Sequence, residues 1–130
     1  MKVTRIIATI PAKDVKRAQA FYEEKLGLSK GEERSDGIVF QAEDGTGFLL
    51  FQSSGAPSGT HTQIGFEVDD FTSAIKELKG KGIRFEEYDF PGFKTVDGVA
   101  EVDGSKGAWF KDPDGNLAAI TERTPARVSS

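Results

Sequence analysis

Hydrophobic and polar positions along the chain follow the same order twice. In the first half, the β-branched and apolar run at residues 6–10 predicts a strand at about residues 4–10 that Pro11 closes. Asp14 is a suitable N-cap for the segment after it, where apolar residues recur every three or four positions, so a helix is expected that ends at Gly27. Three further strands are expected at about residues 28–33, 38–42 and 47–52. The first half is therefore predicted to be a βαβββ module.

The second half repeats this order after a Ser-, Gly- and Pro-rich stretch at residues 53–60, which has the composition of a linker. Residues 61–68 alternate between apolar and polar side chains and predict a strand. Asp69 or Asp70 is expected to cap a second helix that ends at Gly80–Gly82. The remaining strands are expected at about residues 83–88, at 99–102 or 106–110, and at 117–121. The second half is also predicted to be βαβββ.

Matching segments in the two halves favour a duplication. Residues 40–45 (FQAEDG) and 110–115 (FKDPDG) correspond at an offset of 70, whereas the capping Asp14 and Asp70 correspond at an offset of 56. The difference requires an insertion, which falls in the aromatic and Gly-rich segment 89–98. Such a segment is either a long surface hairpin or a lid over a binding site, and both interpretations stay open here.

Composition narrows the class of protein. With 130 residues, the chain is expected to be one domain, with a first module at about 4–52, a linker at 53–60, a second module at about 61–123 and a tail at 124–130. A net charge of -4 provides no electrostatic attraction for nucleic acid or an anionic membrane, so neither is expected as a partner. The lack of Cys and of a signal-peptide pattern predicts a cytoplasmic protein.

Three segments carry a family resemblance. Residues 21–28 (FYEEKLGL), 61–69 (HTQIGFEVD) and 109–116 (WFKDPDGN), together with the repeated module, resemble the vicinal oxygen chelate superfamily, which includes glyoxalase I, extradiol dioxygenases and bleomycin-resistance proteins. The resemblance covers about residues 4–123. It implies an α+β fold in which two tandem βαβββ modules form an incomplete, cup-shaped mixed β-barrel with helices on the outside. It also implies a homodimer, and leaves open whether modules pair within one chain or between two.

The resemblance further implies four metal-ligand positions, which fall on Ile7, Leu50, Gln63 and Ala119. Three of these side chains have no donor atom. A register slip of two would bring His61 and Gln52 onto two of the positions. A transition-metal centre normally takes three or four ligands from His, Cys, Asp and Glu, and the chain has one His and no Cys. The sequence therefore predicts no metal and no other cofactor.

Strand parity predicts a mostly apolar pocket on the concave face, with a few amide and hydroxyl groups, as is common in small-molecule sites. The residues expected to line it are Ile7, Thr9, Phe48, Leu50, Gln52, Gln63, Gly65, Ala119 and Thr121. Tyr88, Phe93 and Trp109 are expected to form an aromatic wall for a flat ligand, with core packing as the other interpretation of Trp109.

Glu67, Glu101 and His61 are the candidates for acid-base chemistry. Each also has a simpler interpretation, namely a surface salt bridge for the carboxylates and a solvated strand end for His61. Gln63 either orients a ligand or makes a cross-strand hydrogen bond. The leading hypothesis is a metal-independent protein that binds a small, partly aromatic or apolar molecule. The alternatives are a glyoxalase-like lyase or isomerase or a dioxygenase-related enzyme, and a structural or regulatory dimer whose cavity is filled by its own side chains.

Overall fold

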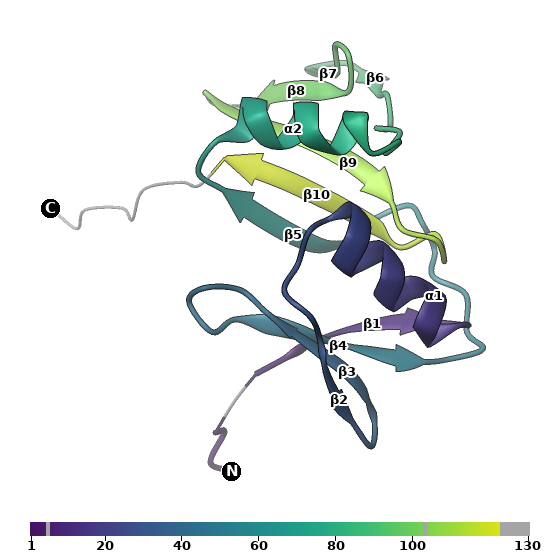
Figure 1. The fold of residues 1–130 in the computed structure, drawn as a ribbon. Coiled ribbons are helices and arrows are strands. Elements are labelled where there is room, and N and C mark those ends of the chain that lie inside the picture. The colour runs from purple at the N-terminus through teal and green to yellow at the C-terminus, as the bar shows by residue number, and fades with distance from the viewer. Residues whose placement is uncertain (5, 103, 123–130) are drawn as a thin grey trace, which may run out of the picture. The chain divides into compact units, whose positions relative to one another are not determined.

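The computed structural model describes residues 1–4, 6–102 and 104–122 and shows a mixed α+β fold with two four-stranded sheets (Figure 1). By their contacts, the residues divide into two units. The first holds Met1–Gln63 and Asp112–Asn116, and the second holds Ile64–Lys111 and the chain from Leu117 on. Within the described ranges, no helix has the length and apolar character that crossing a membrane requires.

The sheet of the first unit has the strand order β1-β4-β3-β2. Its strands are β1 (Ala8–Ala12), β2 (Glu32–Arg34), β3 (Gly37–Gln41) and β4 (Gly47–Gln52). β1 runs parallel to β4, and the other pairs are antiparallel. The helix α1 (Val15–Ala20) continues as a π-helical segment, η1 (Phe21–Lys25). The Asp14 carboxylate accepts a hydrogen bond from the Arg17 N–H at 3.2 Å, which confirms the predicted N-cap.

The core of the first unit forms where the helical segment covers the sheet. The ring of Tyr22 lies 5.9 Å from that of Phe40 and 5.1 Å from that of Phe48, and Tyr22 is fully buried. Ile10 and Leu50, which are paired in register, are also fully buried. Each such side chain stabilises the fold by about 1.5–3 kcal/mol relative to exposure. The chain leaves η1 through Gly27, whose φ of 71° suits glycine at a helix end.

Two expected strand boundaries and one expected strand were wrong. Pro11 lies inside β1 instead of ending it, which is possible because β1 is an edge strand and a proline there need not donate to a ladder. β2 is confined to Glu32–Arg34 instead of residues 28–33. Residues 83–88 form no strand, because only Phe85 bridges to Phe110 there.

The sheet of the second unit has the order β5-β10-β9-β8. Its strands are β5 (Thr62–Val68), β8 (Val99–Val102), β9 (Ser105–Lys111) and β10 (Leu117–Glu122), so both strands left as alternatives at 99–102 and 106–110 are present. The helix α2 (Phe71–Gly80) is capped by Asp70, whose carboxylate accepts a hydrogen bond from the Ser73 N–H at 3.1 Å. If the inserted hairpin is set aside, both sheets have the order first, fourth, third, second strand, as a duplicated module predicts.

The inserted segment folds as a hairpin of β6 (Asp89–Phe90) and β7 (Phe93–Lys94). Thr95 closes its base, because its N–H donates to the Tyr88 carbonyl at 2.9 Å and its Oγ1 accepts from the Tyr88 N–H at 2.8 Å. The Thr95 side chain is buried, which is unusual for a loop residue and shows that the hairpin is anchored. The surface-hairpin interpretation therefore describes the observed conformation, and the role of a lid stays a prediction.

Candidate functional site

The hairpin carries an aromatic cluster onto one face of the second sheet. The indole of Trp109, on β9, lies 5.4 Å from the ring of Phe93 and 6.0 Å from that of Tyr88, both edge to face. The rings of Tyr88 and Phe93 lie 6.1 Å apart. The three residues expected to form an aromatic wall are thus in mutual contact. We call these residues, together with Phe90, the aromatic cluster.

Phe90 is the member that the sequence interpretation missed. Its ring stacks at 6.0 Å from the ring of Tyr88 and at 6.5 Å from that of Phe93, and the residue is 58% exposed. The available signal was its place in the same inserted segment as Phe93. An exposed phenylalanine that continues a packed cluster offers a flat apolar surface to a ligand.

Strand register places small residues beneath the cluster. Ala119 pairs with Trp109 and Thr121 pairs with Gly107, so these four residues share one face of the sheet. A Cβ at Gly107 would lie 3.2 Å from Cη2 of Trp109, so the indole lies close over the Gly107 backbone. Ala119 and Thr121 thus share a face, as strand parity predicted, and Trp109 lies on the same face.

Tyr88 gives the cluster its one hydroxyl group. Burial raises the pKa of the Tyr88 phenol, and the nearby charge of Glu86 raises it further. Glu86 itself lies 3.6 Å from the ammonium group of Lys111. At neutral pH the phenol is therefore a neutral hydrogen-bond donor at the edge of an otherwise apolar surface.

In the first unit, the expected pocket face was assigned to the wrong side of β4. Ile10 pairs with Leu50, and Phe48 contacts the ring of Tyr22, so Phe48 and Leu50 lie under the helical segment and are buried. Gln52 shares their side by strand alternation. The face away from the helix instead carries Leu49 and Phe51.

Those two side chains are half-buried, and they pair in register with Thr9 and Pro11 of β1. Thr9 therefore does lie on the face away from α1, as expected for a pocket residue. Ile7 precedes β1 and is half-buried. The ligand-binding roles of Ile7 and Thr9 stay predictions.

The polar candidates near the start of β5 each have a partner within the protein. Gln63 Nε2 donates to the Thr9 carbonyl at 3.5 Å, and its role toward a ligand stays a prediction. His61 is exposed, and its Nδ1 lies 2.7 Å from Oγ of Ser58 in the linker. These contacts describe a strand end and its connection, with His61 in a solvated position.

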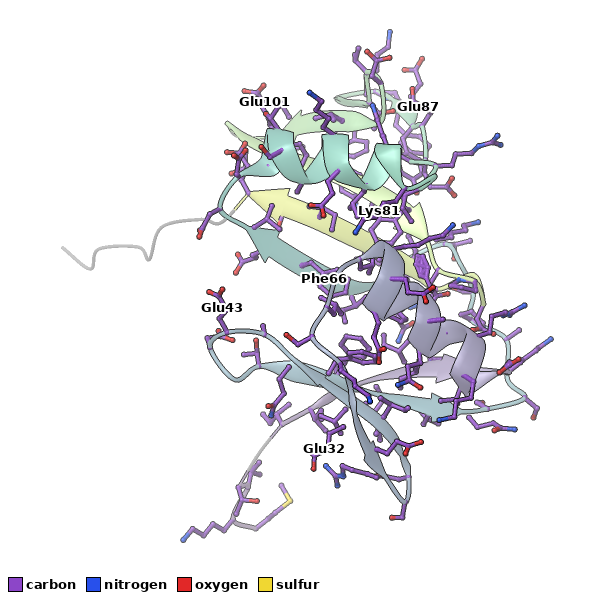
Figure 2. All side chains as sticks on the ribbon, in the orientation of Figure 1. Glu32, Glu43, Phe66, Lys81, Glu87 and Glu101 are labelled. Atoms are coloured by element: carbon purple, nitrogen blue, oxygen red, sulfur yellow. The ribbon has the colours of Figure 1, made fainter. Side chains whose placement is uncertain are left out.

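The two carboxylate candidates lie in different places. Glu101 pairs with Lys106 across β8 and β9, which puts it on the opposite face from Trp109, and it projects outward from the second unit (Figure 2). Its expected position toward the pocket is therefore wrong. Glu67 is exposed on β5, and its parity sets it with Gly65, which is also exposed. A catalytic role for Glu67 stays a prediction.

The turn at Asp112–Asn116 forms a buried polar network that the sequence analysis did not anticipate. The Tyr22 hydroxyl donates to Asp112 Oδ2 at 2.7 Å, and Asn116 Nδ2 donates to the same oxygen at 2.8 Å and to the Pro11 carbonyl at 3.0 Å. Asp112 Oδ1 accepts the backbone N–H groups of Asp114 and Asn116, both at 2.9 Å. The carboxylate of Asp112 is therefore satisfied by four donors and serves a structural role.

Comparison with known proteins now places the chain in a family. Residues 5–120 match the family described as the Glyoxalase/Bleomycin resistance protein/Dioxygenase superfamily. The chain belongs to this superfamily. The recognition made from the helix end, the β5 segment and the DPDGN turn is confirmed. No curated protein matches the sequence.

The chain is similar to solved structures of proteins that are named for different functions. Oxidase ChaP-H2 is 22% identical, with a TM-score of 0.70 over 95% of this chain and 98% of its own. The fosfomycin resistance protein FosX from Listeria monocytogenes is 16% identical, with a TM-score of 0.69 over 96% and 97%. A lactoylglutathione lyase from Agrobacterium tumefaciens is 20% identical, with a TM-score of 0.62 over 93% and 95%. At these identities the likeness shows the fold alone.

The superfamily resemblance implies a metal, and the side chains present do not fit one. Ile7, Leu50 and Ala119 have no donor atom, and Gln63 is a weak ligand. Correcting the register of β4 exchanges Leu50 for Leu49 or Phe51, which are equally apolar. Among the residues that the structure describes, no group of three His, Cys, Asp or Glu side chains is arranged to hold an ion. A divalent ion normally requires such a group.

Proposed function

We propose that this superfamily member binds a small, flat, aromatic or largely apolar molecule at the aromatic cluster of its second unit, and that it does so without a metal. The mutual contact of Tyr88, Phe93 and Trp109, continued by the exposed Phe90, carries the proposal. Aromatic pairs contribute about 0.5–1.5 kcal/mol beyond the burial of their area, so a flat ligand on this surface is recognised by stacking. The neutral Tyr88 hydroxyl adds one directional hydrogen bond.

Binding rather than catalysis is favoured by the placement of the ionisable candidates. Glu101 lies on the face opposite Trp109, and His61 lies at a solvated strand end beside Ser58. A general acid or base must come within hydrogen-bond reach of the reacting atom, directly or through one water molecule. A ligand stacked on the cluster therefore has no ionisable partner among these two candidates, which supports sequestration as the activity.

We further propose the finer architecture that the superfamily implies. In it, the two sheets form an incomplete, cup-shaped mixed β-barrel with the helices outside, and the protein acts as a cytoplasmic homodimer. The shared strand order of the two sheets supports the pairing of modules. Multi-angle light scattering tests the dimer, and a species of only 14.1 kDa would contradict it.

Trp109 makes the ligand proposal directly measurable, because it is the single tryptophan of the chain. We expect its fluorescence to change saturably when naphthol or catechol is titrated into the protein. Phe90→Ala should weaken binding about tenfold, since it removes one stacking surface. Val96→Ala is the matched control, because Val96 is 66% exposed in the following turn and is not part of the cluster. No saturable change with any flat aromatic probe, or equal weakening by both variants, would contradict the proposal.

Calorimetry tests the absence of a metal requirement. After treatment with a chelator, the protein should still bind the aromatic probe with unchanged affinity, and titration of Ni²⁺ or Zn²⁺ should show no tight stoichiometric binding. Tight binding of either ion at one per chain would overturn this part of the proposal.

A further inference from the structure

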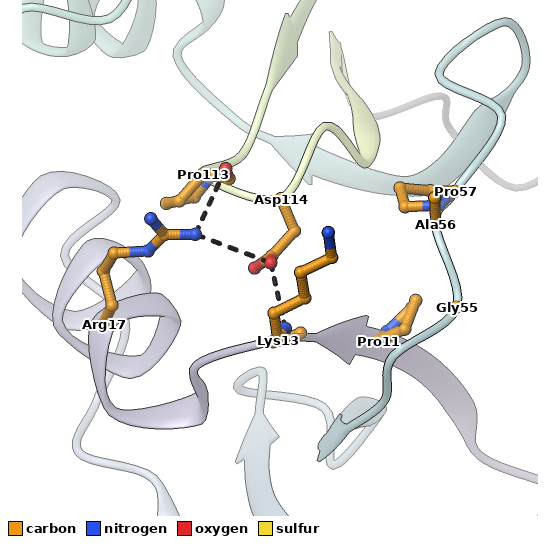
Figure 3. A pocket seen from close by; sticks show the side chains of 9 residues that line it. Pro11, Lys13, Arg17, Gly55, Ala56, Pro57, Pro113 and Asp114 are labelled. Carbon is orange, nitrogen blue, oxygen red and sulfur yellow. Dashed lines mark hydrogen bonds and ion pairs between the residues drawn. The ribbon is translucent and has the colours of Figure 1, made fainter.

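A concave site lies within the first unit, where the end of β1 meets the Asp112–Asn116 turn. It is a cleft of about 330 Å³ (Figure 3). Pro11, Pro57 and Pro113 provide apolar walls, and Lys13, Arg17 and Asp114 provide the charges. None of these residues belongs to the aromatic cluster, so the cleft is independent of the function proposed above.

Asp114 is the buried polar group of the cleft. Its side chain is only 4% exposed, although it carries a carboxylate. Oδ1 accepts a hydrogen bond from the Lys13 N–H at 3.0 Å and lies 3.6 Å from the Arg17 guanidinium. Oδ2 is buried and has no hydrogen-bond partner among the described residues. Buried carboxylate oxygens are normally satisfied, so Oδ2 lacks a donor that a ligand can supply.

The positive groups of the cleft are not balanced by this carboxylate. Arg17 is already engaged, with Asp114 and with the Pro113 carbonyl at 3.5 Å. The ammonium group of Lys13 makes no ion pair with the part of the chain that the structure describes, and its side chain extends beside Asp114 (Figure 3). Two cations thus face one anion. The cleft has an unpaired cation next to an unpaired acceptor.

We propose that this cleft binds a small α-hydroxy or α-amino carboxylate. The ligand's carboxylate pairs with Lys13 and with the free donors of Arg17, while the hydroxyl or ammonium group on the adjacent carbon donates to Asp114 Oδ2. A simple anion would leave Oδ2 without a donor, and a simple cation would be repelled by Lys13. The proline walls suit a short apolar substituent, and the volume is at the small end of the range for ligand sites.

Glycolate and acetate are the probes that test this proposal, since they differ only by the hydroxyl group. Titrations followed by amide NMR should show glycolate binding about tenfold tighter than acetate, the effect of one hydrogen bond to a charged group. Shifts should centre on Lys13 and Asp114. Equal affinities for the two probes, no binding of either, or shifts centred on Trp109 would overturn the proposal.

Two variants separate the two halves of the site. Asp114→Asn should remove the preference for glycolate, because an amide group replaces the carboxylate acceptor. Lys13→Met should weaken the binding of both probes about tenfold, because it removes the unpaired charge. Lys16→Met is the matched control, because Lys16 is exposed, pairs with Glu33 at 2.7 Å and does not line the cleft. Equal weakening by Lys13→Met and Lys16→Met would show non-specific attraction and overturn the proposal. If Asp114→Asn does not fold, the lysine pair and the two probes on the unmodified protein still decide the question.

Discussion

The hydroxyl of Tyr22 donates a 2.7 Å hydrogen bond to Asp112 Oδ2, although 90 residues separate the two along the chain. Tyr22 is fully buried, and Asp112 is 5% exposed. Tyr22 belongs to the FYEEKLGL segment and Asp112 to the DPDGN turn, which are two of the three segments that carried the family resemblance. The two segments are therefore useful for recognising the superfamily because they meet in the folded protein and form this buried hydrogen bond. Neither Tyr22 nor Asp112 belongs to the aromatic cluster or lines the cleft, so this pair identifies the fold and not a ligand.

Replacing Tyr22 by Phe should destabilise the protein. The variant keeps the ring packing against Phe40 and Phe48 but leaves Asp112 Oδ2 with one donor fewer. We expect the free energy of unfolding to fall by about 1–3 kcal/mol, the usual effect of removing a partner from a buried polar group. Urea denaturation followed by circular dichroism measures this change.

Tyr88→Phe is the control for this substitution, because Tyr88 is the second tyrosine of the chain and its hydroxyl makes no hydrogen bond with the described residues. Its free energy of unfolding should change by less than about 0.5 kcal/mol. If the two variants were equally stable, the hydrogen bond between Tyr22 and Asp112 would contribute nothing to the fold.

The same hydrogen bond predicts how the free energy of unfolding depends on pH in the alkaline range. Burial, and then the charge of Asp112 and the hydrogen bond to it, raise the pKa of Tyr22 far above its ordinary value. The unfolded phenol titrates near pH 10, so above that pH the unfolded chain loses a proton that the folded protein retains. The stabilisation that comes from the buried, protonated Tyr22 phenol is complete below pH 10. Above pH 10 it is lost at about 1.4 kcal/mol per pH unit.

Tyr22→Phe isolates this effect from the titration of lysines. Unfolding free energies of the two proteins, measured from pH 9 to pH 11, should converge above about pH 10, because the variant lacks the titrating phenol. Parallel curves across this range would show that Tyr22 retains no proton on folding.

Sequence periodicity predicted most of the elements and the residues that cap the helices, because these features depend on local chemistry. Asp14 and Asp70 lie where a side-chain oxygen can accept the free N–H groups of a first turn. Part of the aromatic wall was also predictable, since Phe93 lies in the inserted segment and Tyr88 directly precedes it. Phe90 was missed because exposure cannot be judged from a two-residue strand such as β6.

The turn before β8 provides a second structural test. Gly98 has a φ of 81°, and a Cβ at this position would lie 2.6 Å from Phe85 Cβ. Gly98→Ala should therefore combine the strain of a left-handed conformation with overpacking, for a total destabilisation of about 2–5 kcal/mol. Thermal unfolding of the purified variant measures it.

Gly92→Ala is the matched control, since Gly92 also has a φ of 81° but a Cβ added there would have no atom within 4 Å among the described residues. It should show the conformational strain alone, about 1–2 kcal/mol. Equal destabilisation by the two variants would mean that the contact between Gly98 and Phe85 is loose enough to accommodate a methyl group.

The pocket face of β4 could not be predicted because the strand is apolar on both sides. Its sequence Gly47-Phe48-Leu49-Leu50-Phe51-Gln52 has no alternation, so a shift of one residue exchanges the two faces without any change in pattern. The family resemblance then suggested Leu50 as a pocket position. The pairing of Ile10 with Leu50 beneath the helical segment decides the register instead.

Substituting adjacent leucines tests this register directly. Leu50→Ala should lower the free energy of unfolding by about 2–5 kcal/mol, because Leu50 is fully buried and truncation leaves a cavity. Leu49→Ala removes the same atoms from a half-buried position on the other face and should have a clearly smaller effect. Urea denaturation of both variants makes the comparison. A larger loss of unfolding free energy for Leu49→Ala would show that Leu49, and not Leu50, lies beneath the helix. Leu50 would then lie on the face away from the helix, and the pocket position implied by the superfamily would be correct.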